Sequence, residues 1–574
     1  MPSLPVSCSA ASAAEREPLL QGSRTAPNND NSRWVPGATM MFFLPRVAIF
    51  LFLWAVCSIS SLMANPPDTL PAYRVAIIGA GPAGISAARQ LRNSPSALYV
   101  QFNITIYDAK PVVGGVLALH ETNGSSIFPK NELMQNSITA EDIAGTALMW
   151  NNALFTQDSE KALKNKVEFV ELGPQEVGYY KDDLKIASVS RPYRKIPMKA
   201  WAQLLWTYGN SVWRGDKLAR DGSLRKAVLS APREPDVEKI FKSLGALKPL
   251  RKRAKDLLRD RRISDRYATD LLEPQVQRAH GQGLDQVTGF AAMMAAAQEE
   301  SANAYRGGNL IQQLQRVVHD IDVNVRTARH VTQIKCVEIA EKRPAWLIRH
   351  ENAEGGGNSS VEVFDKVIMA ASDFDVQLQN GDETMLDLRT YYNTTANTTD
   401  TKPREERDRD LMVPVHVTFF TSTARFISPW DDEQVLFLEP QGPAGMRELT
   451  LVREVVNDRD DNTTDIEYLY RVLSQHPVLD ELQSRTNITW SYQTKIEKAY
   501  PVLSPIQRFP SFEIPWAKGF WWTSVIQHAG TSVDLSWLAG KAAAQALIDQ
   551  VLESHYFWAK PFSFSRLFKP LILW

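Results

Sequence analysis

The sequence contains little cysteine. Its three cysteines, Cys8, Cys57 and Cys336, are too few to build a disulfide framework for 574 residues, and Cys57 lies inside an apolar run. Histidines and cysteines are not spaced like the ligands of a metal site. The sequence therefore argues against disulfide-based redox chemistry and against a metal centre, so a bound cofactor would have to carry any redox reaction.

An excess of charge of one sign is absent too. The 64 lysines and arginines balance 65 aspartates and glutamates, which gives a net charge of −1. This balance gives no reason to expect a nucleic acid as partner. The length of 574 residues is too great for one small core and indicates two or three intertwined domains.

One long apolar run lies near the N-terminus. Residues 47–64 carry no charge and are just numerous enough to span a bilayer, and several arginines precede them. We predict a disordered cytosolic tail over 1–39, a signal-anchor over 40–64 and a lumenal body, with a cleaved signal peptide as the alternative. The aromatic and basic tail over 554–574 is expected to lie either on a membrane surface or against the body.

Glycosylation sequons support a lumenal body, although several are expected by chance in a chain of this length. An acidic dileucine pattern at Leu19-Leu20 resembles a lysosomal or vacuolar sorting signal, with a chance match of this short pattern as the alternative. We therefore expect a glycoprotein in the lumen of an endomembrane compartment, either lysosome- or vacuole-like or secretory. The predicted glycosylation sites are Asn103, Asn123, Asn358, Asn393, Asn397, Asn462 and Asn487.

A strand, a glycine-rich turn and a helix follow one another after residue 73. The apolar run Arg74 to Ile78 leads into a G-x-G-x-x-G turn, and a helical pattern continues from Ile85 to Leu91. In such a turn the first glycine permits the sharp bend, the second lets the backbone approach a pyrophosphate, and the third lets the helix pack close to the strand. The helix N-terminus faces the phosphate charge. The predicted cofactor contacts of this dinucleotide-binding unit are Gly79, Gly81, Pro82, Ala83 and Gly84.

A second strand completes the unit. The strand pattern over 103–107 ends in Asp108, 24 residues beyond Gly84, where the partner of a ribose hydroxyl is expected. The pair Gly114-Gly115 follows, as in FAD enzymes of the glutathione reductase and amine oxidase type, in which the glycines let the backbone run beside the flavin. Those enzymes usually have arginine after the pair, whereas this chain has Val116.

The fold class predicted from these patterns is α/β. Segments 65–135, 300–380 and 498–553 form one Rossmann-like FAD-binding domain of the glutathione reductase and amine oxidase type. A substrate domain interrupts it, with a helical pattern over 136–299 and β-like runs over 381–497.

Further candidate contacts come from the later segments of the cofactor domain. Strand patterns over 330–334 and 366–371 contribute Val331 and Ala370. Near the C-terminus, residues 520–536 read as a strand, a turn of small residues and a helix N-terminus, whose dipole would stabilise negative charge on a reduced flavin. An ordinary strand-to-helix turn is the alternative. The candidates from this turn are Gln527, Ser532 and Asp534 as cofactor contacts and His528 as a catalytic residue.

The order and spacing of several blocks resemble the prenylcysteine oxidase (prenylcysteine lyase) family over most of residues 73–550. The chain departs from the family pattern at Val116, Gln527 and His528 and in its two long tails. Besides the glycine-rich turn, the blocks are Gly124-Ser125-Ser126-Ile127-Phe128-Pro129-Lys130-Asn131, Leu272-Glu273-Pro274, Gly281-Gln282, Gly289-Phe290-Ala291, Tyr305-Arg306-Gly307-Gly308-Asn309, Ala499-Tyr500-Pro501 and the turn from Gln527 to Ser536.

This resemblance implies an FAD-dependent oxidase that breaks down farnesyl- or geranylgeranyl-cysteine. A hydride leaves the carbon attached to sulfur for non-covalently bound FAD, water adds to that carbon, and the adduct collapses to cysteine and a prenyl aldehyde. Molecular oxygen accepts the electrons and gives hydrogen peroxide. The protein then supplies position, a dry pocket and electrostatics, so no catalytic constellation is needed.

The sequence supports candidate substrate contacts less strongly than cofactor contacts. The apolar stretch after residue 289 and two aromatic residues in the family blocks could line a long apolar pocket, and His528 could contact the flavin. Ordinary core packing, or a structural hydrogen bond for His528, is the competing interpretation for each. The candidates are Phe128, Phe290, Met293, Met294 and Tyr305.

Two other functions stay open at this point. A flavin oxidase or dehydrogenase of specialised metabolism, acting on a prenylated or polyketide-like apolar substrate, would share the fold. The other is a degenerate, non-enzymatic flavoprotein that binds a lipid or a partner through its aromatic tail, although the intact glycines and Asp108 argue against a loss of cofactor binding.

Overall fold

The computed structural model divides the chain into two compact units, 1–69 and 70–574, and the described residues belong to the second. The predicted tail 1–39, the predicted anchor 40–64 and nearly all of 554–574 lie outside the described residues and stay predictions. Among the described helices none combines the length and hydropathy needed to cross a membrane. The structure describes residues 70–95, 99–117, 147–149, 158, 169–171, 175–191, 198–222, 236–298, 302–305, 310–339, 343–353, 359–371, 377–380, 383–384, 388, 412–438, 445–458 and 464–555.

A parallel sheet assembles from all three segments that were assigned to the cofactor domain. Its strand order is β20-β12-β1-β2-β8, and each neighbouring pair runs parallel. The predicted strands before and after the glycine-rich turn are confirmed. The bounds are Ala72–Ile78 (β1), Gln101–Tyr107 (β2), Asn324–Arg326 (β8), Lys366–Met369 (β12) and Phe520–Trp522 (β20).

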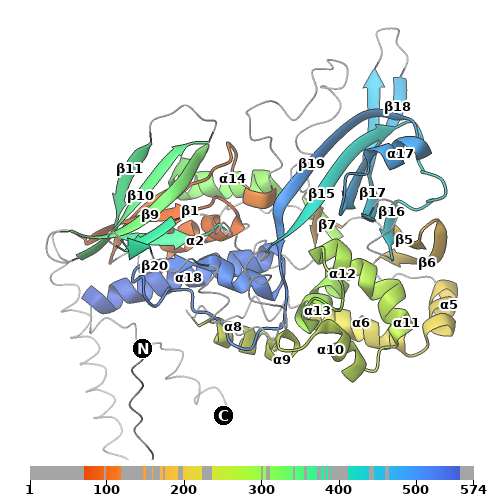
Figure 1. Cartoon of the computed structure of the whole chain (residues 1–574), viewed down its shortest axis with the longest axis horizontal. Helices are drawn as coiled ribbons and strands as arrows, with labels where there is room; N and C mark the ends of the chain where they lie inside the picture. Colours follow the sequence, from red (N-terminus) through yellow and green to blue (C-terminus); the bar gives the residue numbers. More distant parts are fainter. Residues whose placement is uncertain are drawn as a thin grey trace, which may run out of the picture. The chain divides into compact units, whose positions relative to one another are not determined.

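Two helices distant in sequence pack together beside this sheet (Figure 1). They are α2 (Pro82–Asn93), which follows the glycine-rich turn, and the alanine-rich α18 (Val533–His555). Gly540 permits a close approach, because a Cβ there would lie 1.9 Å from the backbone oxygen of Ala83. The Ser86 hydroxyl donates a hydrogen bond of 2.6 Å to the backbone oxygen of Trp537. The last segment of the chain therefore completes the core that the first βα unit begins.

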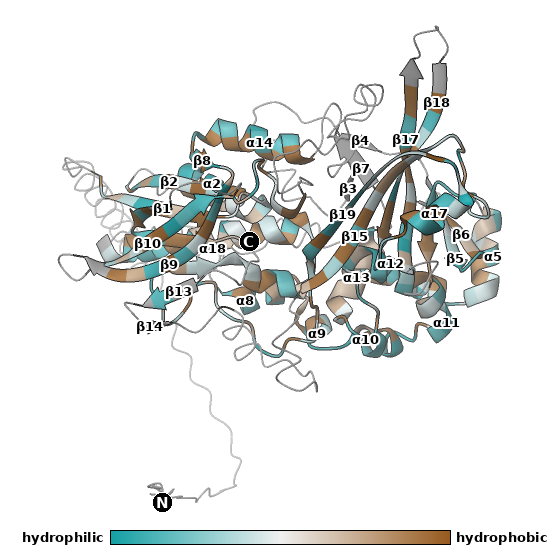
Figure 2. Ribbon diagram, turned by 45° about the horizontal axis from the view of Figure 1, so that its top comes forward, coloured by the Kyte–Doolittle hydropathy of each residue, from teal (hydrophilic) through white to brown (hydrophobic). Residues whose placement is uncertain are grey.

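A second sheet and one amphipathic helix share this core. The sheet has the order β11-β10-β9-β13-β14, and buried residues such as Ile334 and Trp346 join the core cluster of β1. Helix α14 (Leu310–Ile321) packs on α2 and alternates polar and apolar residues, as Figure 2 shows. The strands are Arg329–Ile339 (β9), Arg343–Asn352 (β10), Ser360–Phe364 (β11), Gln377–Asn380 (β13) and Glu383–Thr384 (β14).

A seven-stranded sheet joins the two stretches assigned to the substrate domain. Its order is β19-β15-β18-β17-β16-β5-β6, and β5 lies parallel to β16. The hairpin β5–β6 falls in the stretch that was predicted to be helical, so that prediction was wrong there. The strands are Gln175–Lys181 (β5), Leu184–Arg191 (β6), Met412–Ser422 (β15), Gln434–Phe437 (β16), Met446–Asp458 (β17), Thr464–Ser474 (β18) and Ile488–Pro501 (β19).

Helices account for most of the described residues in the rest of the 136–299 stretch, where the short strands β3 and β4 also depart from the helical prediction. Helix α13 is apolar along nearly its whole length and is buried accordingly. Helices α8 and α9 pack on the core of the parallel sheet and also contact α13, so they join the two predicted domains, which sequence patterns did not reveal. The helices are Met198–Tyr208 (α5), Ser211–Gly222 (α6), Val237–Ser243 (α8), Leu247–Leu250 (α9), Ala254–Asp260 (α10), Asp265–Tyr267 (α11), Glu273–His280 (α12), Gly289–Gln298 (α13) and, further on, Leu479–Arg485 (α17).

A small sheet has the order β3-β7-β4, with Ala147–Met149 (β3), Ala302–Tyr305 (β7) and Phe169–Glu171 (β4).

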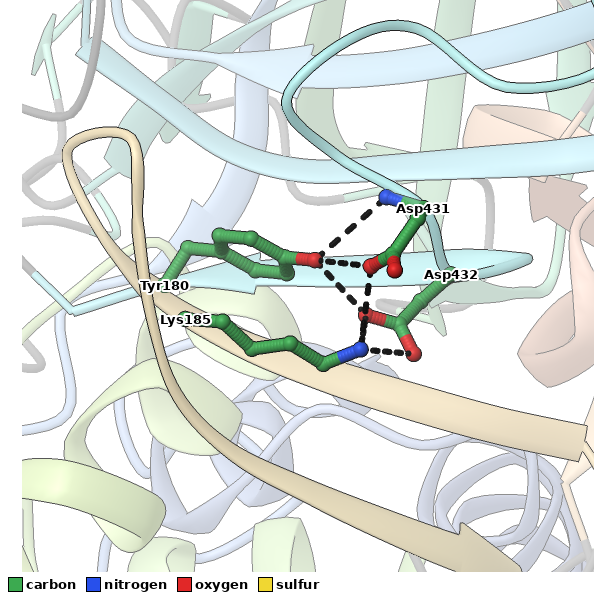
Figure 3. Close-up of polar contacts among 4 residues, drawn as sticks. All are labelled: Tyr180, Lys185, Asp431 and Asp432. Atoms are coloured by element: carbon green, nitrogen blue, oxygen red, sulfur yellow. Dashed lines mark hydrogen bonds and ion pairs between the residues drawn. The ribbon is translucent and has the colours of Figure 1, made fainter.

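A polar cluster fastens the β5–β6 hairpin to the loop before β16 (Figure 3). The Tyr180 hydroxyl shares its one proton between carboxylate oxygens of Asp431 at 2.7 Å and Asp432 at 2.9 Å. The Lys185 ammonium lies 3.0 Å from Asp431 and 2.8 Å from Asp432. Gly178 leaves room for this arrangement, since a Cβ there would meet Asp432 at 2.0 Å. The cluster is structural and lies outside the cavity described next.

Candidate cofactor and substrate cavity

A cavity of about 620 Å³ opens at the carboxyl ends of β1 and β12. Ligands of open α/β sheets bind at this edge. One wall, the cofactor wall, is built by the turn after β1, the end of β12 and the turn before α18. The other, the substrate wall, is built by strands β15, β18 and β19 of the seven-stranded sheet. One cavity is therefore shared by both predicted domains.

Close approach of the backbone shapes the glycine-rich turn. Gly79 has φ +107°, and a Cβ there would lie 3.1 Å from the backbone of Ala370. A Cβ at Gly84 would lie 1.9 Å from the backbone oxygen of Gly79. Gly84 does not line the cavity; it lets α2 pack onto the turn, whereas Gly79, Gly81, Pro82 and Ala83 do line it.

The N-terminus of α2 suits a phosphate group. Gly81 is the N-cap, no side chain caps the helix, and Pro82 occupies the first turn. The first N–H groups of an α-helix have no partner within the helix. With the helix dipole, these free donors make the end of α2 a site for negative charge.

Asp108 is fixed at the end of β2 by backbone groups. One carboxylate oxygen accepts from the N–H of Ala80 at 2.6 Å and the other from the N–H of Lys110 at 2.8 Å. Burial raises the pKa of Asp108, and these N–H groups act in the opposite direction. Each oxygen keeps a further lone pair, and the residue lines the cavity, so it can accept from a ribose hydroxyl.

The Gly114-Gly115 pair lies against the first glycine-rich turn. Both residues have positive φ, and the Gly114 N–H donates to the backbone oxygen of Ala80 at 3.0 Å. A Cβ at Gly115 would lie 3.0 Å from the Cα of Gly81. Gly115 lines the cavity, and so does Val116, which stands where related enzymes have arginine, whereas Gly114 does not.

Only some of the predicted cofactor contacts in the turn before α18 line the cavity. Gln527 and Ser532 line it, as do Val331 and Ala370 from the other segments. The Ser532 hydroxyl also accepts from the N–H of Leu535 at 3.0 Å and so caps α18. Asp534 is buried in the first turn of α18 and does not line the cavity.

His528 lies away from the cavity. Its ring is buried, and Nδ1 faces the backbone oxygen of Val502 at 3.5 Å. Burial lowers the pKa of His528 to about 4, so the ring is neutral at physiological pH. This placement gives the predicted catalytic role no support and favours the alternative of a structural hydrogen-bonding residue.

The predicted substrate contacts belong to the core. Phe290 is fully buried and packs edge-on against Phe241 with ring centroids 5.9 Å apart, and Met293 and Met294 are buried in α13. Their burial follows from the apolar character of the whole helix, so the structure favours core packing over substrate contact for these residues. Phe128 and the side chain of Tyr305 lie outside the described residues.

Sequence reasoning missed the substrate wall. Side chains from β15, β18 and β19 alternate in direction, and those on one face line the cavity. The alternation of Val413 to Phe420 was visible in the sequence, but only the sheet order shows which face meets the cavity. The missed residues are Met412, Val415, Val417, Phe419, Arg471, Leu473, Ile496 and Tyr500.

The residues present fit a flavin dinucleotide. The space beside Gly79, Gly81 and Gly115 stays open for a cofactor because these residues have no Cβ. The N-terminus of α2, which no side chain caps, suits a pyrophosphate, and Asp108 lies where the partner of a ribose hydroxyl is expected. The cavity volume of about 620 Å³ lies in the range of cofactor sites.

Comparison with known proteins agrees with this fold. An NAD(P)-binding Rossmann-like domain pattern matches residues 77–131. A triple mutant of putrescine oxidase redesigned in cofactor binding has a TM-score of 0.51 at 13% identity, with 84% of this chain and 100% of that chain covered. A double mutant of the same oxidase has a TM-score of 0.50 at 12% identity, with 84% and 100% covered. No curated protein matches the sequence significantly.

The prenylcysteine lyase family pattern matches residues 197–557, which is more than half of the chain. This match spans the substrate wall and the turn before α18, and the Rossmann-like pattern covers the glycine-rich turn. The chain therefore belongs to the prenylcysteine lyase family, as its sequence predicted, and has the fold of an FAD-dependent oxidoreductase.

Proposed function

We propose that this protein is an FAD-dependent thioether oxidase that cleaves farnesyl- or geranylgeranyl-cysteine, with molecular oxygen as electron acceptor. The observation that carries the proposal is the shared cavity, whose one wall fits a flavin dinucleotide and whose other wall is largely apolar with Arg471 and Lys498 among its side chains, in a chain of the prenylcysteine lyase family. The balanced reaction converts prenylcysteine, oxygen and water into cysteine, a prenyl aldehyde and hydrogen peroxide.

The residues of the cofactor wall would hold FAD. The first turn of α2 binds the pyrophosphate through backbone N–H groups, and Asp108 accepts from a ribose hydroxyl. Gly81 and Gly115 keep the cavity floor free of side chains. When bound, FAD supplies the two-electron oxidation of the carbon next to sulfur.

The substrate wall would hold the prenyl chain. Val415, Val417 and Phe419 on β15 present apolar side chains to the cavity, and Leu473 and Ile496 extend this surface onto β18 and β19. An isoprenoid chain leaves water favourably when it enters such a surface. The wall would thus position the thioether beside the cofactor wall.

Product analysis tests the proposal. The full-length, FAD-loaded protein is incubated in air with S-farnesylcysteine, and hydrogen peroxide, farnesal and cysteine are measured together. Equal amounts of the three are expected. A flavin-loaded protein that makes none of them would contradict the substrate and leave an oxidase of specialised metabolism, acting on another apolar compound, as the remaining function.

We also propose that the body is lumenal and glycosylated. Of the seven sequons, Asn103 and Asn487 lie in the described part of the chain, and both are exposed. Asn123, Asn358, Asn393, Asn397 and Asn462 lie outside it. A mobility shift on enzymatic deglycosylation, reduced in Asn487→Gln, is expected for protein from cells, and an unchanged mobility would contradict a glycosylated lumenal body.

A further inference from the structure

Three arginines come together at one end of the substrate wall. Arg471 on β18 lines the cavity, and Arg447 on β17 and Arg278 on α12 are each 5% exposed. They share the surroundings of Glu448 and Tyr500, because both residues act electrostatically on Arg278 and Tyr500 also acts on Arg447. Two neighbouring strands and one helix thus bring positive charge to a single place.

One carboxylate at this place is already engaged. Glu448 is 1% exposed and lies 3.3 Å from the guanidinium of Arg471. It also accepts from the Thr450 hydroxyl at 2.7 Å and from the amide of Gln434. Burial opposes ionisation, but Arg471 and Arg278 hold the pKa of Glu448 below its usual range. Glu448 is therefore charged and can neutralise one of the three guanidinium groups.

Two hydrogen-bond donors of Arg447 and Arg471 lack an acceptor among the residues that the structure describes. Within the described residues, Nη1 of Arg447 and Nε of Arg471 are buried without a hydrogen-bond partner, and Arg447 makes no ion pair. Burial lowers the pKa of Arg447 and of Arg278, yet a guanidinium keeps its charge in proteins. A buried donor of a cation that lacks a partner is costly. Of the three arginines only Arg471 lines the cavity, so an anion in the cavity can reach the guanidinium of Arg471, with the other two behind it.

Arg471 lies next to the apolar side chains of the substrate wall. Arg471 lies opposite Phe419 of the neighbouring strand and two residues before Leu473 on the same face of β18. Leu473 in turn lies opposite Val417. An occupant of the cavity that covers Val417 and Leu473 therefore meets the guanidinium of Arg471 at its end. Such an occupant has an apolar chain and a terminal anionic group.

We propose that Arg471 binds the carboxylate of the substrate, with Arg278 and Arg447 as positioning residues that supply positive potential behind it. The cavity then selects apolar compounds with a free carboxylate, because a guanidinium pairs with a carboxylate through two parallel hydrogen bonds. This proposal deepens the proposed function and rests on it where the carboxylate is that of the cysteine. It predicts that prenylcysteine is accepted after proteolysis has freed its carboxyl group, and that carboxyl esters of prenylcysteine are poor substrates.

Binding of two unreactive probes tests the proposal independently of turnover. Dissociation constants of dodecanoate and dodecan-1-ol are measured by calorimetry on the full-length, FAD-loaded protein. We expect dodecanoate to bind at least about tenfold more tightly, and Arg471→Gln to abolish this preference. Leu473→Ala is the matched control and should weaken both probes equally. Equal affinity in the wild type, or a preference that survives in Arg471→Gln, would overturn the proposal.

A second variant keeps the test decisive if Arg471→Gln does not fold. Glu448→Gln removes the competing carboxylate with little change of shape, and we expect it to increase the preference for dodecanoate. A purely structural role of the cluster would leave the preference unchanged or reduce it, which would contradict the proposal. Flavin content is measured in each variant, because loss of FAD from Arg471→Gln would show that the cluster serves the cofactor phosphates instead.

Kinetics then connects the site to the reaction. S-farnesylcysteine and its methyl ester are compared, and the ester is expected to have a KM at least about tenfold higher with a similar kcat. In Arg471→Gln the two KM values should converge. Failure of both compounds to react would contradict the proposed function, whereas equal KM values in an active wild type would contradict only the carboxylate site.

Discussion

The two walls of the cavity recognise their ligands by different means. On the cofactor wall, backbone atoms of Gly79, Gly81 and Gly115 form the surface, and added Cβ atoms at Gly79 or Gly115 would press on neighbouring backbone. On the substrate wall, side chains such as Leu473 and Arg471 form the surface. The first wall is therefore specified by backbone shape and tolerates almost no substitution. The second can change its side chains, and hence its substrate, while the sheet stays intact.

The largest effect is expected from one methyl group behind the cofactor wall. In Gly84→Ala the new Cβ would lie 1.9 Å from the backbone oxygen of Gly79, so α2 has to move away from the turn. We expect a loss of about 1–3 kcal/mol of unfolding free energy and at least about a tenfold fall in bound FAD, measured as flavin absorbance per protein. Gly209→Asn serves as control, because Gly209 has open space around it and asparagine tolerates positive φ. Full flavin content in Gly84→Ala would contradict the role of backbone shape.

On the same wall, Asp108→Asn is expected to lower the affinity for FAD with a smaller loss of unfolding free energy than Gly84→Ala. The amide offers one acceptor where the carboxylate accepts two backbone N–H bonds, and its NH₂ group would face one of those donors. Affinity for FAD should fall by about 10–100-fold, as for the loss of a hydrogen bond to a charged group. The exposed Asp320→Asn is the control. Equal FAD affinity of the two variants would show that Asp108 is not a cofactor contact.

On the substrate wall, a change of side chain should alter substrate choice and spare the cofactor. Val417→Phe fills part of the apolar surface, so the longer geranylgeranyl chain should lose more than the farnesyl chain. We expect the ratio of kcat/KM for the two prenylcysteines to shift by about tenfold towards farnesylcysteine, at unchanged flavin content. Loss of FAD from this variant, or an equal fall of kcat/KM for both substrates, would contradict the proposal that the two walls recognise their ligands separately.

Two histidines near the cofactor wall make stability depend on pH. Burial lowers the pKa of His280 and of His528 to about 4, below the unfolded value of about 6.5. Between these values the unfolded chain binds more protons, so their contribution is fully present above about pH 6.5 and is lost as pH falls towards 4, by at most about 1.4 kcal/mol per pH unit for each group. Tm of His528→Gln should fall less steeply between pH 7 and pH 5 than that of the wild type. The exposed His319→Gln should keep the wild-type slope, and an equal slope in all three would contradict a buried neutral His528.

The smallest effect is expected at the cluster of Figure 3, away from both walls. Asp431 is 70% exposed and shares Lys185 with the buried Asp432. Exposed ion pairs contribute about 0–1 kcal/mol. Asp431→Asn should change the unfolding free energy by no more than that and leave flavin content and kinetics unchanged. A loss of activity would mean that the hairpin β5–β6 influences the cavity.

Sequence patterns predicted the strands, the turn and the helix that carry the cofactor wall correctly because these motifs are local. The strand, turn and helix around Gly81 lie within one continuous stretch, and Asp108 ends the next strand, so their spacing fixes their placement. The substrate wall comes from strands far apart in sequence, and a strand pattern does not tell which face meets a cavity. Phe290 and Met293 were chosen for their apolar character, which core residues share. Arg471 carried no local signal, and only the sheet order brings it beside Glu448.

Anaerobic mixing of the FAD-loaded, full-length protein with S-farnesylcysteine tests the central claim most directly, because it requires that cofactor and substrate occupy the same cavity. The account predicts that the flavin absorbance disappears and that one farnesal and one cysteine form for each bound FAD. A flavin absorbance that stays unchanged at saturating S-farnesylcysteine, with no farnesal formed, would contradict it.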